Sequence, residues 1–130
     1  MSSSWPDDPK SYMAAYLEAW NEGDADRVYD AYHVTAPIFT DGVVQGRDAE
    51  SRLAYLGAYL DLTRGELAEG TRWECPSIQV TALGKEAVLV TAQWVFRRMD
   101  GTVLEDYPDS YLLVRIGGRW AFLADVIHTT

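Results

Sequence analysis

The chain has 130 residues, of which 48% are hydrophobic and 24% charged, as expected for one globular domain that buries a core without disulfides. Its formal net charge of −9 disfavours nucleic acid and membrane surfaces as partners, because both are anionic. The single cysteine, Cys75, excludes an intramolecular disulfide and a cysteine-cluster zinc site. The first residues resemble no signal peptide and no run of 18 apolar residues occurs, so we expect a cytoplasmic protein.

The N-terminal part of the chain is expected to be helical. Residues 1–8 are polar and contain proline, which predicts a loose arm. From about Asp8, apolar residues recur every three or four positions and predict an amphipathic helix. They are Tyr12, Ala15, Tyr16, Ala19 and Trp20. Gly23 in N-E-G-D ends this helix, and Asp24 caps a short second helix over residues 25–32.

A short strand and a second long helix are predicted next. Residues 36–40 predict the strand, and residues 41–46 predict a turn with a brief extended piece. G-R-D-A-E begins the helix, which is expected to end near residues 63–65. Its apolar stripe consists of Leu53, Leu56, Ala58, Tyr59, Leu60 and Leu62.

Beyond residue 72 the apolar period changes to two, which predicts strands over residues 73–83, 87–97, 103–116 and 119–128. The breaks L-G-K-E, M-D-G-T and G-G are hairpin signals, so these strands are expected to form an antiparallel meander. Helices followed by such a sheet indicate a single α+β domain. Because the strands are apolar on both faces, we expect helices to cover one face and a second copy of the chain to cover the other, in a homodimer.

The segment Y-L-E-A-W-N-E-G-D-A-D-R-V-Y-D-A-Y resembles the NTF2-like superfamily. A brief strand with T-D-G, a long helix that opens with G-R-D-A, and a closing G-G-R-W-A-F-L strand extend the resemblance over residues 10–128. The chain is most similar to the SnoaL-like branch, which includes polyketide cyclases and ketosteroid isomerases. This resemblance implies a cone in which a curved antiparallel sheet wraps around the helices and encloses an apolar pocket. The superfamily also contains dehydratases, epoxide hydrolases and non-catalytic adaptors.

The resemblance to ketosteroid isomerase implies three acid–base residues. Tyr16 matches the tyrosine that stabilises the enolate oxygen, although it also fits the apolar stripe of its helix. The general base follows the same short strand, and Thr40 or Asp41, in F-T-D-G, matches it depending on a one-residue gap, but T-D-G is also an ordinary turn sequence. Asp109, in D-Y-P-D-S-Y, approximates the position of the protonated aspartate, one or two residues out of register. Pro108 beside it suggests a bulge or an edge strand.

Asp125 is the fourth candidate, because it interrupts the apolar run R-W-A-F-L-A-D-V-I-H. The resemblance directs it into the pocket, near a catalytic aspartate of the SnoaL-like cyclases, where burial would raise its pKa toward neutrality. The alternative is a residue at the rim that pairs with Arg97, Arg98 or Arg115. Simple alternation puts Asp125 on one face with Ala121, Leu123 and Ile127. It puts Trp120, Phe122, Ala124, Val126 and His128 on the opposite face, so His128 is not expected to pair with Asp125.

The expected pocket walls are Trp20, Tyr55, Tyr59, Trp73, Gln93 and Trp94. The sequence contains no metal-ligand spacing, phosphate loop or serine-hydrolase elbow, so we expect neither a metal nor a cofactor. The resulting hypothesis is a pocket for a small apolar or aromatic molecule, in which a cyclic or polyketide-like carbonyl compound undergoes isomerisation, cyclisation or dehydration. One alternative is a non-catalytic ligand-binding or assembly module. Another is an epoxide hydrolase, which in this superfamily holds water between two aspartates linked by an arginine.

Overall fold

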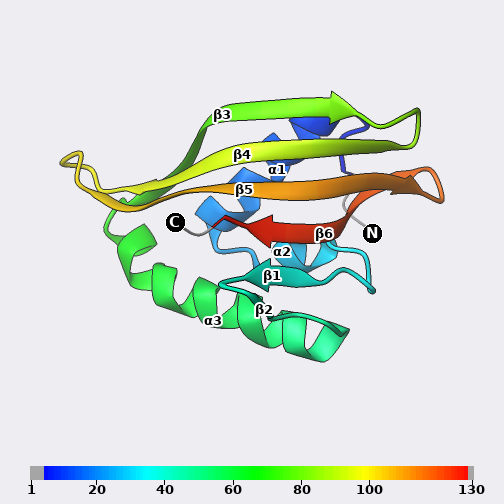
Figure 1. Ribbon diagram of the computed structural model, residues 1–130. Helices are drawn as coiled ribbons and strands as arrows, with labels where there is room; N and C mark the ends of the chain where they lie inside the picture. The colour runs from blue at the N-terminus through cyan, green and yellow to red at the C-terminus, as the bar shows by residue number, and fades with distance from the viewer. Residues whose placement is uncertain (1–4, 129–130) are drawn as a thin grey trace.

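Three helices and six strands make up the protein in a computed structural model that describes residues 5–128 (Figure 1). In chain order they are α1 (Pro9–Glu22), α2 (Ala25–Asp30), β1 (Ile38–Thr40), β2 (Val43–Val44), α3 (Ala49–Ala68), β3 (Arg72–Ala82), β4 (Ala87–Arg97), β5 (Val103–Ile116) and β6 (Arg119–Ile127). Residues 1–4 of the expected N-terminal arm lie outside the described residues. Trp5 is held in place, since its indole N–H donates to Asp30 (3.0 Å).

Local capping explains where the helices begin. The side chain of Asp8 accepts a hydrogen bond from the backbone N–H of Ser11 (3.0 Å) at the start of α1, and Gly23 ends that helix with a left-handed φ of 64°. Asp48 and Ser51 form a reciprocal capping box at the start of α3. These features act within a few residues, which is why they are readable in the sequence.

Helix α3 differs from its prediction at its end and on its buried face. It continues to Ala68, beyond the expected end at residues 63–65, because Leu67 still packs against the core and Gly65 costs a helix only about 1 kcal/mol. Leu56 and Leu60 are buried as expected, but Leu53 and Leu62 are 42% and 76% exposed. The face of α3 that packs against the rest of the protein is therefore narrower than the apolar stripe of that helix.

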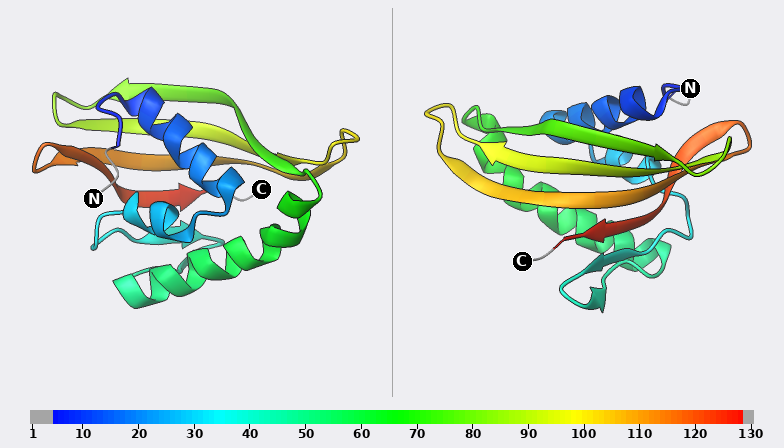
Figure 2. Two further views of the ribbon diagram at one scale, coloured as in Figure 1. Left: turned by 180° about the vertical axis from the view of Figure 1, so that it is seen from behind. Right: turned by 45° about the horizontal axis from the view of Figure 1, so that its top comes forward.

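The strands form one open, curved sheet in the order β2-β1-β6-β5-β4-β3. The three helices lie against one face of this sheet, as the view from behind shows (Figure 2), and no helix covers the face seen in Figure 1. Neighbouring strands are antiparallel except for β1 and β6, which are parallel. The predictions of an α+β fold and of the β3–β6 meander are confirmed, whereas the parallel pairing had no signal in the sequence.

A β-bulge in β6 overturns the predicted alternation. Leu112 pairs with Ala124 and Leu113 pairs with Phe122, so Leu123 is the extra residue between them. Phe122 is fully buried, and Asp125 is on the same inner face of the sheet rather than on the opposite one. The prediction that grouped Asp125 with Leu123 was wrong. One inserted residue shifts the alternation, so each residue of β6 before the bulge lies on the opposite face from the one predicted relative to Asp125.

Pro108 lies in a central strand, not at an edge or a bulge as predicted. It pairs with Gln93 of β4 in continuous register, and β5 has β6 on its other side. The carbonyl of Pro108 accepts the backbone N–H of His128 (3.0 Å), one residue beyond the end of β6. The N–H and C=O groups of one strand residue point toward the same neighbouring strand. The N–H that Pro108 lacks would therefore point toward the end of β6, where the hydrogen bonds between β5 and β6 stop.

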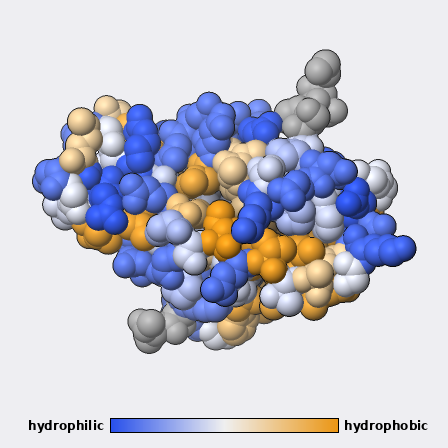
Figure 3. All heavy atoms as spheres, turned by 90° about the horizontal axis from the view of Figure 1, so that it is seen from above, coloured by the Kyte–Doolittle hydropathy of each residue, from blue (hydrophilic) through white to orange (hydrophobic). Residues whose placement is uncertain are grey.

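The uncovered face of the sheet carries both apolar and polar side chains. Phe39, Leu89 and Val126 are at least 40% exposed. On the same face, the hydroxyls of Thr91 and Ser110 are hydrogen-bonded to each other (2.9 Å), and the hydroxyl of Ser110 is also hydrogen-bonded to Nε2 of His128. The view from above, toward the β3 edge, shows an apolar band between hydrophilic ends (Figure 3). None of the helices in the described part of the chain is long and apolar enough to cross a membrane.

Candidate functional site

A pocket opens between the inner face of the sheet and helices α1 and α3. Its empty volume is about 390 Å³, including the space at its mouth. Of its 13 lining residues, nine are aromatic, two are aspartates and two are aliphatic. A cavity with mostly apolar walls and a few polar groups is the usual form of a small-molecule site.

The two aspartates of the pocket come from adjacent strands. Asp125 of β6 pairs in register with Tyr111 of β5, and Asp109 lies two residues before Tyr111 on the same face. Each aspartate is only 3% exposed, and the two carboxyl groups lie close enough to shift each other's pKa. The Oδ1 atom of each has no hydrogen-bond partner among the described residues. Two carboxyl groups so placed are stable when they share one proton.

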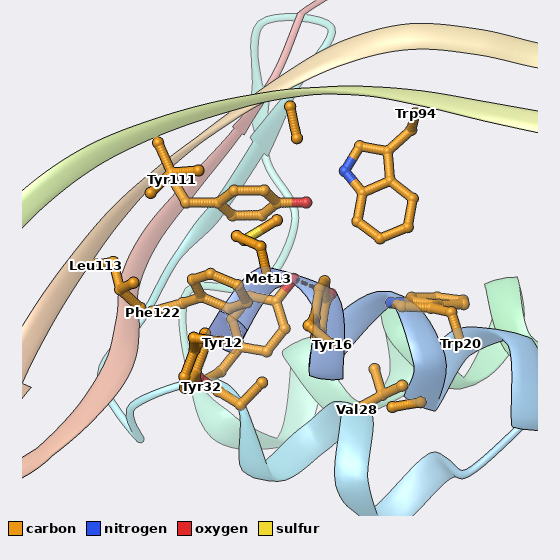
Figure 4. Packing of buried hydrophobic residues seen from close by; sticks show 14 of the residues in the cluster. Tyr12, Met13, Tyr16, Trp20, Val28, Tyr32, Trp94, Tyr111, Leu113 and Phe122 are labelled. Carbon is orange, nitrogen blue, oxygen red and sulfur yellow. Dashed lines mark hydrogen bonds between the residues drawn. The ribbon is translucent and has the colours of Figure 1, made fainter. Parts of the chain in front are cut away.

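Two tyrosine hydroxyls bind the Oδ2 atoms of this pair, and a third tyrosine binds one of those hydroxyls. Tyr32 donates to Oδ2 of Asp125 (2.7 Å), and Tyr111 donates to Oδ2 of Asp109 (2.9 Å). The hydroxyls of Tyr16 and Tyr32 are 2.7 Å apart. Because the Tyr32 proton is used on Asp125, Tyr16 is the donor in this second bond. Figure 4 shows Tyr16 and Tyr32 meeting below Tyr111.

The two carboxyl groups differ in their pKa. Burial, and then the neighbouring charge of Asp125, raise the pKa of Asp109 well above its usual range. Burial also raises the pKa of Asp125, but the hydrogen bonds from Asp109 and Tyr32 stabilise its ionised form. The pKa of Asp109 is raised more than that of Asp125, so Asp109 holds its proton more tightly. Burial raises the pKa of Tyr16, so its hydroxyl stays protonated.

The pocket brings together most of the residues predicted from the sequence. They are Tyr16, Asp109 and Asp125 among the acid–base candidates, and Trp20, Tyr55, Tyr59, Trp73 and Trp94 among the expected walls. Gln93 is not among the lining residues; it alternates with Trp94 and contacts Asp106 on the uncovered face. Asp41 lies in the exposed turn after β1 with a φ of 53°, and it does not line the pocket.

The rim alternative for Asp125 does not agree with the structure. Arg97 pairs with Glu74, Arg98 with Glu66 and Arg115 with Asp7, so the three proposed partners contact other carboxylates. His128 lies on the uncovered face, where its Nε2 is 2.7 Å from the hydroxyl of Ser110.

Sequence reasoning missed three tyrosines of the pocket. Tyr107 and Tyr111 flank Asp109 at a spacing of two, so strand alternation alone could have assigned all three to one face. Tyr32 had no such signal, because it reaches the pocket through a parallel bridge to Phe122. It is nevertheless the residue that links Tyr16 to Asp125.

Two tryptophans supply unused donors. The indole nitrogens of Trp73 and Trp94 are buried and have no hydrogen-bond partner among the described residues. In Figure 4 the nitrogen of Trp94 faces the hydroxyl end of Tyr111. Leaving a donor buried without a partner costs about 1–3 kcal/mol, so a ligand oxygen that accepts these N–H groups would recover this energy.

The raised pKa of Asp109 predicts the pH dependence of stability. The unfolded carboxyl group releases its proton near pH 4. The folded protein retains that proton to higher pH, so its free energy of unfolding is expected to fall as pH rises, by up to about 1.4 kcal/mol per unit. Asp109→Asn resembles the protonated group, so it should reduce this decline to the part contributed by Asp125 and be more stable than the parent at neutral pH. Urea denaturation between about pH 4.5 and 7.5 measures both effects.

Asp106→Asn is the matched control for that measurement, since Asp106 is an exposed aspartate of the same strand. It should leave the decline unchanged. If the free energy of unfolding fell equally with pH in the parent and in Asp109→Asn, Asp109 would not be the group that holds the proton.

Comparison with known proteins agrees with the architecture. Residues 7–130 match the sequence profile of a family described as NTF2-like protein (DUF6841). Among curated proteins, none matches the chain significantly.

Solved structures with the same fold share little sequence with the chain. An NTF-2 like protein of unknown function from Shewanella oneidensis MR-1 is 20% identical with a TM-score of 0.70, over 88% of this chain and 91% of that one. The function unknown protein Rv3472 of Mycobacterium tuberculosis is 14% identical with a TM-score of 0.75, over 94% and 74%. An NTF2-like protein with a cystatin-like fold from Novosphingobium aromaticivorans is 17% identical with a TM-score of 0.70, over 88% and 75%.

Proposed function

The chain belongs to the NTF2-like protein family DUF6841, and on that premise we propose that its pocket performs cofactor-free acid–base chemistry on a cyclic or polyketide-like carbonyl compound. Isomerisation, cyclisation and dehydration of the kind found in the SnoaL-like branch all begin with removal of a proton beside a carbonyl group. The observation that carries the proposal is the buried pair of Asp109 and Asp125 on the wall of an aromatic pocket.

Enolisation requires one acid and one base, and we assign these roles to Asp109, whose pKa is raised more, and to Asp125. Asp125 takes the α-proton of the substrate and, once protonated, no longer needs Asp109 as a donor. Asp109 then gives its proton to the carbonyl oxygen, so a neutral enol forms. In the return step Asp125 delivers its proton to carbon and Asp109 recovers its own. Opposite protonation states in one site are a common mark of acid–base catalysis.

The role that we assign to Tyr16 differs from the one that the family resemblance implied. Its hydroxyl proton is committed to Tyr32, so it does not donate directly to an enolate oxygen. We assign it the task of orienting Tyr32, which in turn holds Asp125. The oxygen of the substrate is then met by Asp109 and by the free N–H groups of Trp73 and Trp94.

A second candidate function is a non-catalytic ligand-binding module, and the committed hydroxyl of Tyr16 is the observation that favours it. Epoxide hydrolysis has less support. Arg52, a buried arginine, donates to the carbonyls of Ala36 (2.7 Å) and Val34 (3.1 Å), and the pocket lining includes no arginine that could link the two aspartates.

Hydrogen exchange separates catalysis from binding. We expect the protein to accelerate incorporation of deuterium beside the carbonyl of β-tetralone in D₂O, followed by NMR. Asp41→Asn should exchange as fast as the parent, since Asp41 lies on an exposed turn. Binding of the ketone without acceleration would favour the ligand-binding module.

We also propose that the uncovered face of the sheet forms a homodimer, because Phe39, Leu89 and Val126 expose apolar surface there. Light scattering should then give twice the chain mass of 14.6 kDa. Leu89→Lys should give a folded monomer, whereas Leu62→Lys, on the exposed side of α3, should leave the mass unchanged. A monomeric parent protein would contradict the proposal.

A further inference from the structure

The pocket is acidic as well as aromatic. Its 13 lining residues include Asp109 and Asp125 but no lysine, arginine or histidine. When the two aspartates share one proton they carry one negative charge, and each of them is only 3% exposed. Charges in such surroundings are screened far less than charges at the surface.

No lysine or arginine among residues 5–128 forms an ion pair with either aspartate. The buried arginine, Arg52, donates to two backbone carbonyls and does not line the pocket. Arg97, Arg98 and Arg115 pair with carboxylates elsewhere. Oδ1 of each pocket aspartate lacks a hydrogen-bond partner among the described residues.

The aromatic rings that line the pocket suit a cationic ligand. Tyr55 and Tyr59 of α3 have ring centroids 5.6 Å apart, and Trp73 and Tyr107 from the sheet have centroids 6.2 Å apart. All four line the pocket, so aromatic rings from α3 and from the sheet bound the same space. The negative faces of aromatic rings attract ammonium groups, most strongly where water is excluded.

We propose that the ligand of this pocket carries a cationic nitrogen, such as a quaternary or protonated tertiary ammonium group, in addition to its carbonyl group. The nitrogen lies among the aromatic rings, close enough to the aspartate pair to offset its charge, and the carbonyl oxygen accepts the free indole N–H groups. The inference rests on the proposed function for the carbonyl group and narrows its substrate class. It also excludes anionic ligands, because they would meet a buried like charge.

Isosteric ketones test the role of the positive charge directly. Phenacyltrimethylammonium and phenyl neopentyl ketone have the same shape, since carbon replaces nitrogen in the second, and β-benzoylpropionate is an anionic relative. Quenching of tryptophan fluorescence reports binding, because Trp20, Trp73 and Trp94 line the pocket. The cation is expected to have a dissociation constant at least about tenfold lower than the neutral ketone, or about 1.4 kcal/mol, and the anion the highest.

Three variants locate the charge that produces the preference. Asp125→Asn should abolish it, because the remaining Asp109 stays protonated. Asp109→Asn should keep it, because it replaces the neutral member of the pair. Asp106→Asn should also keep it, which shows that the net charge of −9 is not the cause. The preference should persist in about 0.5 M NaCl, where attraction to surface charges is largely screened.

Equal affinity for the cation and the neutral ketone, binding of neither, or a preference that survives in folded Asp125→Asn would each overturn the inference. Near-UV circular dichroism shows whether Asp125→Asn is folded. If it is not folded, the affinities of the parent protein for the cation and the neutral ketone in high salt decide whether the inference holds. Exchange of β-tetralone is a separate result. A protein that prefers the cation but never exchanges the ketone retains the ligand class and loses the proposed catalysis.

Discussion

Replacement of Asp125 by asparagine is expected to lower the rate of α-hydrogen exchange in a bound ketone by roughly 10²–10⁴-fold, the usual contribution of a positioned general base. The amide has the size of the carboxylate and can still accept the hydroxyl proton of Tyr32, so the pocket should keep its shape. What it loses is the capacity to take a proton. The rate is measured by NMR at saturating ketone, so that a change in affinity does not enter.

Two controls accompany that experiment. Asp41→Asn removes the other aspartate that the sequence suggested as a base, and it should leave the rate unchanged. Tyr32→Phe should lower the rate less than Asp125→Asn, because it removes one hydrogen bond to the base but not the base itself. If Asp125→Asn retained the full rate while folded, Asp125 could not be the base.

Replacement of Phe122 by alanine is expected to reduce the free energy of unfolding by about 3–5 kcal/mol, the usual cost of removing a buried phenylalanine. Phe122 has no exposed surface, and its ring centroid is 4.4 Å from that of Tyr111 and 4.8 Å from that of Tyr16. Its centroid is also 5.2 Å from that of Tyr32, so this one ring supports both tyrosines that donate to the aspartates. Urea denaturation at one pH gives the change.

The matched control is Phe39→Ala. Phe39 is 40% exposed on the uncovered face of the sheet and should contribute far less to the stability of the monomer. It should be measured in the monomeric Leu89→Lys background, so that loss of a dimer does not add to the result. A cost below about 1 kcal/mol for Phe122→Ala would mean that the ring does not pack as described.

The order of helices and strands was predictable because its signals are local. The caps at Asp8 and Asp48 act within one helical turn, and Gly23 ends α1 by its own conformation. The period of two and the hairpin glycines likewise describe neighbours in the chain. The end of α3 was not predictable, since residues 66–68 remain helical through contacts that α3 makes with the rest of the protein.

The candidate site was predictable only in part. The family resemblance indicated Tyr16 and Asp109, and the apolar surroundings of Asp125 singled it out. The faces of β6 were assigned incorrectly before the bulge, because the extra residue, Leu123, has no signature in the sequence. Asp125 was nonetheless expected on the pocket side, through the resemblance rather than through alternation.

By itself, then, the sequence determined the α+β class, the helix caps, the meander and the presence of an acidic residue inside an apolar strand. The tertiary structure alone decided that Asp125 lies beside Asp109 and that Tyr32, 93 residues earlier in the chain, holds it. The reason is physical. Caps and hairpins depend on residues that are already neighbours, whereas the approach of two carboxyl groups on adjacent strands depends on bulges and packing that are set only after the chain has folded.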